Sequence, residues 1–221
     1  MQTALITGAN RGIGLELCHQ LKKKGFQITA VCRQGSDALK LLDVEIIEGI
    51  DVSQDQSIAK LKNALGDSRT FDLVINNAGL LDQNTVDHFD FESILRQFQI
   101  NAVGPLRIVE VIKDMMPQGS KLVMITSRMG SIADNTSGSR YGYRMSKAAL
   151  NIASVSLAQD FKDKQIAVGI IHPGFVKTDM TGHTGHLEPS ESASNILARI
   201  EEFTLETSGT FWHSNGDKLP W

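Results

Sequence analysis

The chain of 221 residues has few of the features that mark disulfide-rich or zinc-stabilised proteins. It contains only two cysteines, Cys18 and Cys32, and has no CxxC pair or Cys/His spacing that suits a metal ion. Each cysteine lies in an apolar-periodic segment, so we expect two buried free thiols and a reducing compartment. His183 and His186 stand in a glycine-rich loop, where we expect them to contact substrate and not to bind metal.

The sequence also lacks a strong charge bias and long apolar runs. The formal net charge is −3, and charged residues make up 21% of the chain, which argues against a nucleic-acid or anionic membrane partner. No apolar run approaches the roughly 20 residues that a membrane-spanning helix needs. The N-terminus runs directly into an apolar segment and leaves no room for a signal peptide. We therefore expect a cytoplasmic protein.

Short apolar runs alternate with amphipathic segments along the whole chain. The pattern predicts strands at 4–6, 26–32, 44–50, 71–75, 120–126, 166–171 and 209–212, and helices at 13–24, 36–42, 54–65, 91–116, 141–162 and 189–206. Such alternation favours parallel strands joined by right-handed helical crossovers. The strands are apolar throughout, as a sheet covered on both faces requires. We expect an α/β fold, one Rossmann domain over residues 1–221 with a doubly wound parallel sheet of about seven strands.

A glycine-rich turn, T-G-A-N-R-G-I-G at residues 7–14, separates the first strand from the first helix. Glycines allow positive φ and let a ligand approach the main chain. The N-terminus of the following helix suits a pyrophosphate, and Gly14 lets helix and strand pack closely. The spacing differs from the G-x-G-x-x-G fingerprint. A glycine-rich turn without a ligand is the alternative.

Tyr143 and Lys147 share one face of the predicted 141–162 helix. A nearby ammonium lowers the pKa of a phenol from its ordinary value of about 10, which makes the pair a usable proton donor and acceptor. Ser127 ends the fifth predicted strand, where its hydroxyl could bind a carbonyl oxygen beside the phenol. The alternatives are an ordinary surface Tyr–Lys pair and a turn serine.

The chain resembles the short-chain dehydrogenase/reductase family along nearly its whole length. The segments that match arrive in the family's order: Thr7-Gly8-x-x-x-Gly12-x-Gly14, Asp51-Val52, Asn76-Asn77-Ala78-Gly79, Asn101, Ser127, Tyr143-x-x-x-Lys147, and Pro173-Gly174 followed by Thr178. Each motif is weak alone, and the ordered set is highly specific.

The resemblance implies four catalytic residues. Tyr143 corresponds to the general acid that protonates the carbonyl oxygen during reduction, and Ser127 to the group that orients this oxygen. Lys147 corresponds to the residue that binds the nicotinamide ribose and tunes the tyrosine. Asn101 corresponds to the residue that kinks the long helix and holds a water of the proton relay.

The same resemblance, with the glycine turn, implies where a nicotinamide cofactor lies. Residues 51–52 match the adenine pocket, residues 77–79 the adenosine side, and residues 173–178 the nicotinamide end. The expected cofactor contacts are Gly8, Asn10, Arg11, Gly12, Ile13, Gly14, Arg33, Asp51, Val52, Asn77, Ala78, Gly79, Tyr143, Lys147, Pro173, Gly174, Val176 and Thr178.

The end of the second strand favours NADP(H) over NAD(H). NAD-dependent proteins of this kind place a carboxylate there to bind the ribose 2′-hydroxyl. Cys32 takes that position here, and Arg33 follows it. We expect Arg11, in the glycine turn, to project towards the same ribose. Two guanidiniums would then bracket a 2′-phosphate with charge-assisted hydrogen bonds.

The segment after Thr178 is short and resembles the compact carbonyl-reductase branch that includes C-factor and Sniffer. The resemblance implies NADPH-dependent reduction of aldehyde or ketone groups in small molecules. The alternatives are a signalling NADP(H)-binding homologue without catalysis and a 3-oxoacyl reductase. We also expect a homodimer or homotetramer through the 141–162 helix, whose other face carries Ala149, Ala153 and Leu157.

Overall fold

The computed structural model describes all 221 residues and confirms the doubly wound α/β fold. Seven parallel strands form one sheet in the order β3-β2-β1-β4-β5-β6-β7. The strands are β1 Thr3–Thr7, β2 Gln27–Val31, β3 Glu45–Ile47, β4 Leu73–Asn76, β5 Lys121–Ile125, β6 Ala167–His172 and β7 Phe211–His213.

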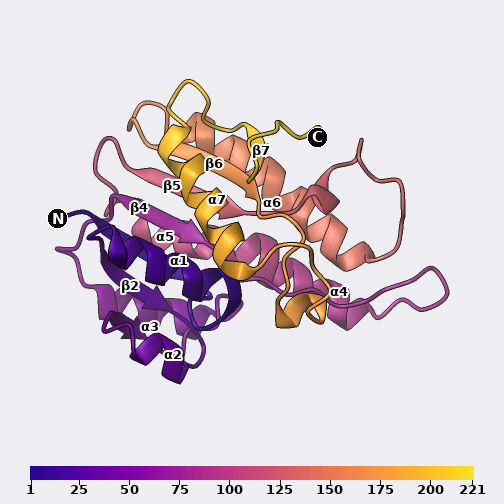
Figure 1. The fold of residues 1–221 in the computed structure, drawn as a ribbon, viewed down its shortest axis with the longest axis horizontal. Helices are drawn as coiled ribbons and strands as arrows, with labels where there is room; N and C mark the ends of the chain where they lie inside the picture. The colour runs from indigo at the N-terminus through magenta and orange to yellow at the C-terminus, as the bar shows by residue number, and fades with distance from the viewer.

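Helices cover both faces of this sheet, as Figure 1 shows. One face carries α1 and α7, which pack against each other, and the other carries α3, α5 and α6. The helices are α1 Gly12–Lys23, α2 Asp37–Lys40, α3 Asp55–Leu65, α4 Phe91–Phe98, α5 Gly104–Ile112, α6 Tyr141–Asp160 and α7 Pro189–Glu202, with short 3-10 turns η2 Arg128–Gly130 and η3 Asp179–Thr181. No helix is both long enough and apolar enough to span a membrane.

The two core layers follow from the alternation of side chains along each strand. Successive residues of a strand point to opposite faces of the sheet. Leu5 therefore packs into the layer of α3, α5 and α6, whereas Ala4 and Ile6 pack into the layer of α1 and α7. All three are fully buried, which is why the strands read as continuous apolar runs.

The strand order creates a switch point between β1 and β4. From β1 the chain proceeds outward through β2 and β3, and it then crosses back to place β4 on the other side of β1. Crossovers leaving the carboxyl ends of neighbouring strands in opposite directions open a crevice there. This edge is where the sequence predicts ligand binding.

The prediction of one continuous helix over 91–116 is wrong, because the structure divides this region. A π-helical segment, η1 Gln99–Val103, separates α4 from α5, and α5 ends at Ile112. Pro105 has no N–H with which to bond the carbonyl of Asn101, so regular α-helical bonding cannot continue through this point. Single π turns of this kind are frequent at functional sites.

Candidate active site

The glycine turn after β1 has the backbone that the sequence predicts. Gly8 and Gly12 adopt φ of +65° and +53°, values that favour glycine. A Cβ on Gly14 would overlap the carbonyl oxygen of Gly8 and lie 2.6 Å from the Asn77 amide nitrogen. The turn is therefore packed so tightly against β4 that only hydrogen fits at this position.

A cavity of about 1110 Å³ lies at the carboxyl edge of the sheet beside this turn. It begins near Arg33 at the end of β2 and reaches Tyr143 and Lys147 on α6. Of the expected cofactor contacts, those that line it are Gly8, Asn10, Arg11, Gly12, Ile13, Arg33, Asp51, Val52, Asn77, Ala78, Gly79, Tyr143, Lys147, Pro173 and Thr178. A cavity of this volume beside a glycine-rich helix N-terminus suits a dinucleotide.

Five expected site residues do not line this cavity: Gly14, Asn101, Ser127, Gly174 and Val176. Three of them have clear supporting positions. Gly14 lies behind the glycine turn, and the Asn101 amide lies behind Gly79, whose Cβ would meet its Oδ1 at 3.3 Å. The Ser127 hydroxyl accepts a hydrogen bond from the Met129 amide at 3.1 Å and begins the turn η2.

Tyr143 and Lys147 lie together on the buried face of α6, as their spacing predicts. Tyr143 is 7% exposed and Lys147 4% exposed. The Lys147 ammonium lies 5.8 Å from the centroid of the Tyr143 ring and donates a hydrogen bond to the carbonyl of Ile125 at 2.9 Å. The carboxyl end of β5 therefore anchors the lysine beside the tyrosine ring.

The expected effect of the ammonium on the phenol is wrong for this arrangement. Burial raises the pKa of Tyr143 to about 12, while contact with the Ser127 hydroxyl and the charge of Arg140 act in the opposite direction. Burial also lowers the pKa of Lys147 to about 8. A low-dielectric environment disfavours the charged form of both groups. The site therefore holds the tyrosine protonated, which is the form that a proton donor needs.

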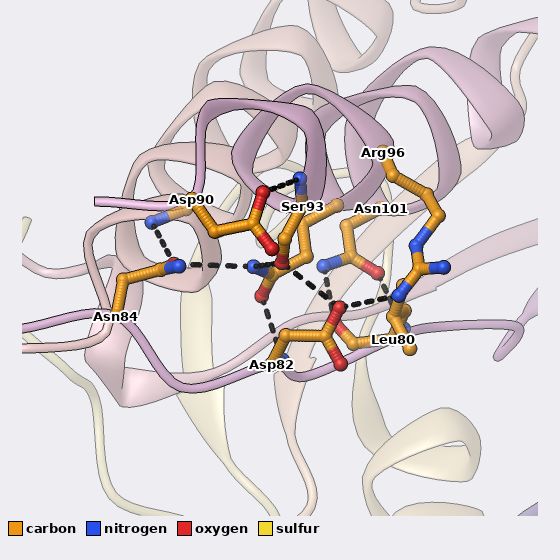
Figure 2. Close-up of polar contacts among 9 residues, drawn as sticks. Leu80, Asp82, Asn84, Asp90, Ser93, Arg96 and Asn101 are labelled. Atoms are coloured by element: carbon orange, nitrogen blue, oxygen red, sulfur yellow. Dashed lines mark hydrogen bonds and ion pairs between the residues drawn. The ribbon is translucent and has the colours of Figure 1, made fainter. Parts of the chain in front are cut away.

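The Asn101 side chain joins three segments next to the π turn. Its amide nitrogen donates to the carbonyl of Leu80 at 2.7 Å and to the Ser146 hydroxyl at 2.9 Å, and its oxygen accepts from the Leu80 amide at 2.8 Å. Asn101 is fully buried. These bonds tie the segment after β4 to α6, and Figure 2 shows the two bonds between Asn101 and Leu80.

A second buried cluster, which we did not predict from the sequence, fixes the start of α6. The Asn84 side-chain oxygen accepts hydrogen bonds from the Gly142 amide and the Gln97 side chain, both at 3.3 Å, and its carbonyl accepts from the Arg140 amide at 2.7 Å. Asn84 is 1% exposed and Gln97 is fully buried. These bonds hold the backbone on the N-terminal side of Tyr143. The signal in the sequence was Gln97, a polar residue on the inward face of an amphipathic helix.

Figure 2 shows how this cluster continues through Asp82. The Asp82 carboxylate accepts from the Ser93 hydroxyl at 2.9 Å and from Arg96 at 2.7 Å, and its amide donates to the Gln97 side chain at 3.0 Å. Asp90 caps α4 by accepting from the Ser93 amide at 2.9 Å. The loop 80–90 is therefore fastened to α4 at Asp82, Asn84 and Asp90.

Arg11 is engaged differently from the expectation. Its guanidinium forms an ion pair with Asp179 at 2.7 Å, and His183 lies 3.1 Å from the same carboxylate. The ion pair joins the glycine turn to the loop after β6. Arg33 lines the cavity and has no ion-pair partner. His186 packs edge-on against the Phe175 ring, and no three side chains come together as metal ligands.

Comparison with known proteins gives a consistent result along the whole chain. The family model described as short chain dehydrogenase matches residues 2–188. The 1-hydroxy-2-glutathionyl-2-methyl-3-butene dehydrogenase of Rhodococcus sp. is 35% identical over 226 residues, and the match covers 100% of both chains. The C-signal protein of Myxococcus xanthus is 39% identical over 153 residues, which cover 68% of this chain and 92% of that protein.

Solved structures agree with this assignment. The NADPH-bound carbonyl reductase from chicken fatty liver superposes with a TM-score of 0.89 at 26% identity, covering 100% of this chain and 99% of that one. The carbonyl reductase Sniffer of D. melanogaster gives a TM-score of 0.87 at 29% identity, covering 100% of both chains. The predicted resemblance to the compact branch is thereby confirmed.

The buried Lys147 predicts a pH dependence of stability. Its pKa is about 8 in the folded chain, against an ordinary value near 10.5. Between these values the unfolded chain binds a proton that the folded chain has lost, so stability rises with pH. We expect the free energy of unfolding, relative to Lys147→Met, to increase by up to about 3 kcal/mol from pH 7.5 to pH 10.5.

Urea denaturation of both proteins without nucleotide, across this pH range, measures the difference. Tyr143 is present in both proteins, so its titration cancels in the comparison. Parallel stability curves for the two proteins would contradict the buried position of the lysine.

Proposed function

This chain belongs to the short-chain dehydrogenase family, and from that membership we propose that residues 1–221 form one NADP(H)-binding domain that reduces aldehydes or ketones. The observation that carries the proposal is the buried Tyr143–Lys147 pair at the end of a dinucleotide-sized cavity. Neighbours of the same fold include a carbonyl reductase solved with NADPH and another solved with NADP. The substrate is a small molecule with a carbonyl group.

The proposed chemistry assigns one task to each residue. NADPH, when bound, supplies the hydride. Tyr143, held protonated by burial, donates its proton to the carbonyl oxygen as negative charge develops there. The Ser127 hydroxyl orients that oxygen beside the phenol. Lys147, anchored on Ile125, provides hydrogen bonds to the ribose at the same end of the cavity.

Two other functions make different predictions. Similarity to C-signal keeps open a signalling role, although this chain retains both Tyr143 and Lys147. A 3-oxoacyl reductase would act on 3-oxoacyl thioesters. Measuring NADPH oxidation with a panel of compounds separates these functions. The panel contains aldehydes, aryl ketones, diketones, quinones and 3-oxoacyl thioesters. Cofactor binding without turnover of any compound would favour signalling.

The first test of the mechanism is Tyr143→Phe. The variant keeps the ring and loses the proton donor, so we expect kcat to fall at least about 100-fold, with NADPH affinity within a few-fold of the wild type. Tyr141→Phe is a matched control, because the chain has only two tyrosines and the ring of this one packs at a tilt against Phe89, with the centroids 5.0 Å apart. Steady-state kinetics and nucleotide fluorescence titration measure both effects. A kcat above about a tenth of wild type would remove Tyr143 from the mechanism.

The second test concerns the cofactor. Arg33 has no ion-pair partner, whereas Arg11 is held by Asp179, so we propose that Arg33 contributes more to recognition of the 2′-phosphate. We expect kcat/KM for NADPH to exceed that for NADH at least about tenfold, or roughly 1.4 kcal/mol. Arg33→Ala should remove most of this preference, and Cys32→Asp with Arg33→Ala should reverse it. Arg107→Ala, which removes a guanidinium paired with Asp55, is the charge control. An unchanged preference in Arg33→Ala would contradict the assignment.

We further propose a homodimer or homotetramer in the cytoplasm. Apolar side chains stand exposed on neighbouring helices α4, α5 and α6: Leu95 (65%), Phe98 (38%), Leu106 (40%), Met145 (55%) and Ile152 (65%). Such a patch favours a two-fold contact between copies. The buried free thiols of Cys18 and Cys32 suit a reducing compartment. We expect light scattering at micromolar concentration to give at least twice the 24.2 kDa of one chain, and a monomer mass would contradict the contact.

A further inference from the structure

The backbone of the turn that leads into α6 does not favour an arginine at position 140. Ser139 and Arg140 adopt φ of +55° and +52°, in the left-handed region that residues with a Cβ seldom occupy. The bond from the Arg140 amide to the Asn84 carbonyl, at 2.7 Å, holds this conformation. Glycine would adopt the same backbone with less strain. The backbone therefore gives no reason for an arginine at this position, and the reason must lie in its side chain.

The Arg140 guanidinium has no partner within the chain. The residue is half-buried, and its Nε lies out of contact with solvent without a hydrogen bond. Nearby guanidiniums are engaged: Arg128 pairs with Asp134 at 2.7 Å, and Arg144 donates to the carbonyls of Gly138 and Ser139 at 3.0 and 3.1 Å. A buried donor without a partner is costly, so this guanidinium is a candidate for binding a ligand.

Arg140 lies close to the reacting phenol. It is the N-cap residue of α6 and stands three positions before Tyr143, so the two backbones lie within one turn of each other. Burial raises the pKa of Tyr143, and the positive charge of Arg140 acts in the opposite direction. The pKa of Arg144 is lowered mainly by burial and, to a smaller extent, by the same charge. Arg128, Arg140 and Arg144 have one carboxylate among them, that of Asp134, which already forms an ion pair with Arg128. The surroundings of the phenol are therefore positive in a chain of net charge −3.

We propose that Arg140 is a specificity-determining residue that binds a carboxylate carried by the carbonyl substrate. The substrate class is then aldehydes or ketones with an acidic group. A guanidinium matches a carboxylate through two parallel hydrogen bonds, and a half-buried site strengthens them. The inference rests on the proposed carbonyl reduction, and it adds which carbonyl compounds the site prefers.

Matched substrate pairs test this inference. The 3- and 4-carboxybenzaldehydes carry the anion at two distances from the carbonyl, and their methyl esters keep the shape without the charge. We expect kcat/KM of the wild type to favour at least one acid over its ester by about tenfold, mostly through KM, because an ion pair formed in both ground and transition states changes binding.

Variants of Arg140 identify the group responsible. In Arg140→Gln the acid-to-ester ratio should fall to about one, and Arg140→Lys should restore part of it. Arg140→Gly suits the left-handed backbone, so it should melt no lower than the wild type while losing the preference. Arg96→Gln removes a cavity-lining guanidinium that Asp82 already neutralises, and the ratio should stay near the wild-type value.

Two sets of results separate this inference from the proposed function. Turnover of the esters reports carbonyl reduction itself, and the acid-to-ester ratio reports Arg140. Ester turnover with equal kcat/KM for acid and ester would overturn the inference and leave carbonyl reduction standing. A ratio unchanged in Arg140→Gln and Arg140→Gly, or one that falls equally in Arg96→Gln, would also overturn it.

Discussion

The site depends on the junction of β1 and β4, which the chain crosses at the switch point of the sheet. The Thr7 hydroxyl accepts hydrogen bonds from the amides of Asn77 and Ala78 at 3.0 and 3.1 Å. The Asn77 side chain donates in return to the carbonyls of Thr7 and Gly8, both at 3.1 Å. At the ends of β1 and β4 these backbone groups have no neighbouring strand to pair with, and the side chains of Thr7 and Asn77 satisfy them instead. The glycine turn therefore keeps its shape. The glycine turn and residues 77–79, which both line the cavity, are positioned by this junction.

Burial, more than charge pairing, sets the chemistry at the other end of the cavity. The same low-dielectric surroundings disfavour phenolate at Tyr143 and ammonium at Lys147. The phenol therefore stays neutral there, because desolvation would penalise an ion pair of phenolate and ammonium. A neutral phenol suits reduction, because the carbonyl oxygen gains a proton in that direction.

Local sequence patterns predicted the regular elements and the motif residues well, because these depend on near neighbours. The strands are apolar runs, and Tyr143 and Lys147 share a face through helical spacing alone. Periodicity alone did not predict the π turn at 99–103, because an amphipathic pattern looks the same with one extra residue in a turn; only the family resemblance pointed to Asn101 as a place where the helix is distorted. The Asn84–Gly142 bond and the Arg11–Asp179 pair join residues 58 and 168 positions apart. Nothing in a local pattern specifies such partners, and so the neutral phenol and the engaged Arg11 could not be predicted.

The regular core and the loops around the site are held in place by different kinds of interaction. The carboxyl edge of the sheet and the glycine turn are held by strand pairing and by the Thr7 and Asn77 hydrogen bonds. The loop 80–90 and the turn at 139–142 have no sheet to hold them, and buried side chains such as Asn84 and Gln97 hold them instead. A turn that is fixed by side chains can display a strained residue such as Arg140 without disturbing the strands. Cofactor geometry then depends on the regular core, whereas the choice of substrate depends on a few polar residues in loops, which can change while the core stays intact.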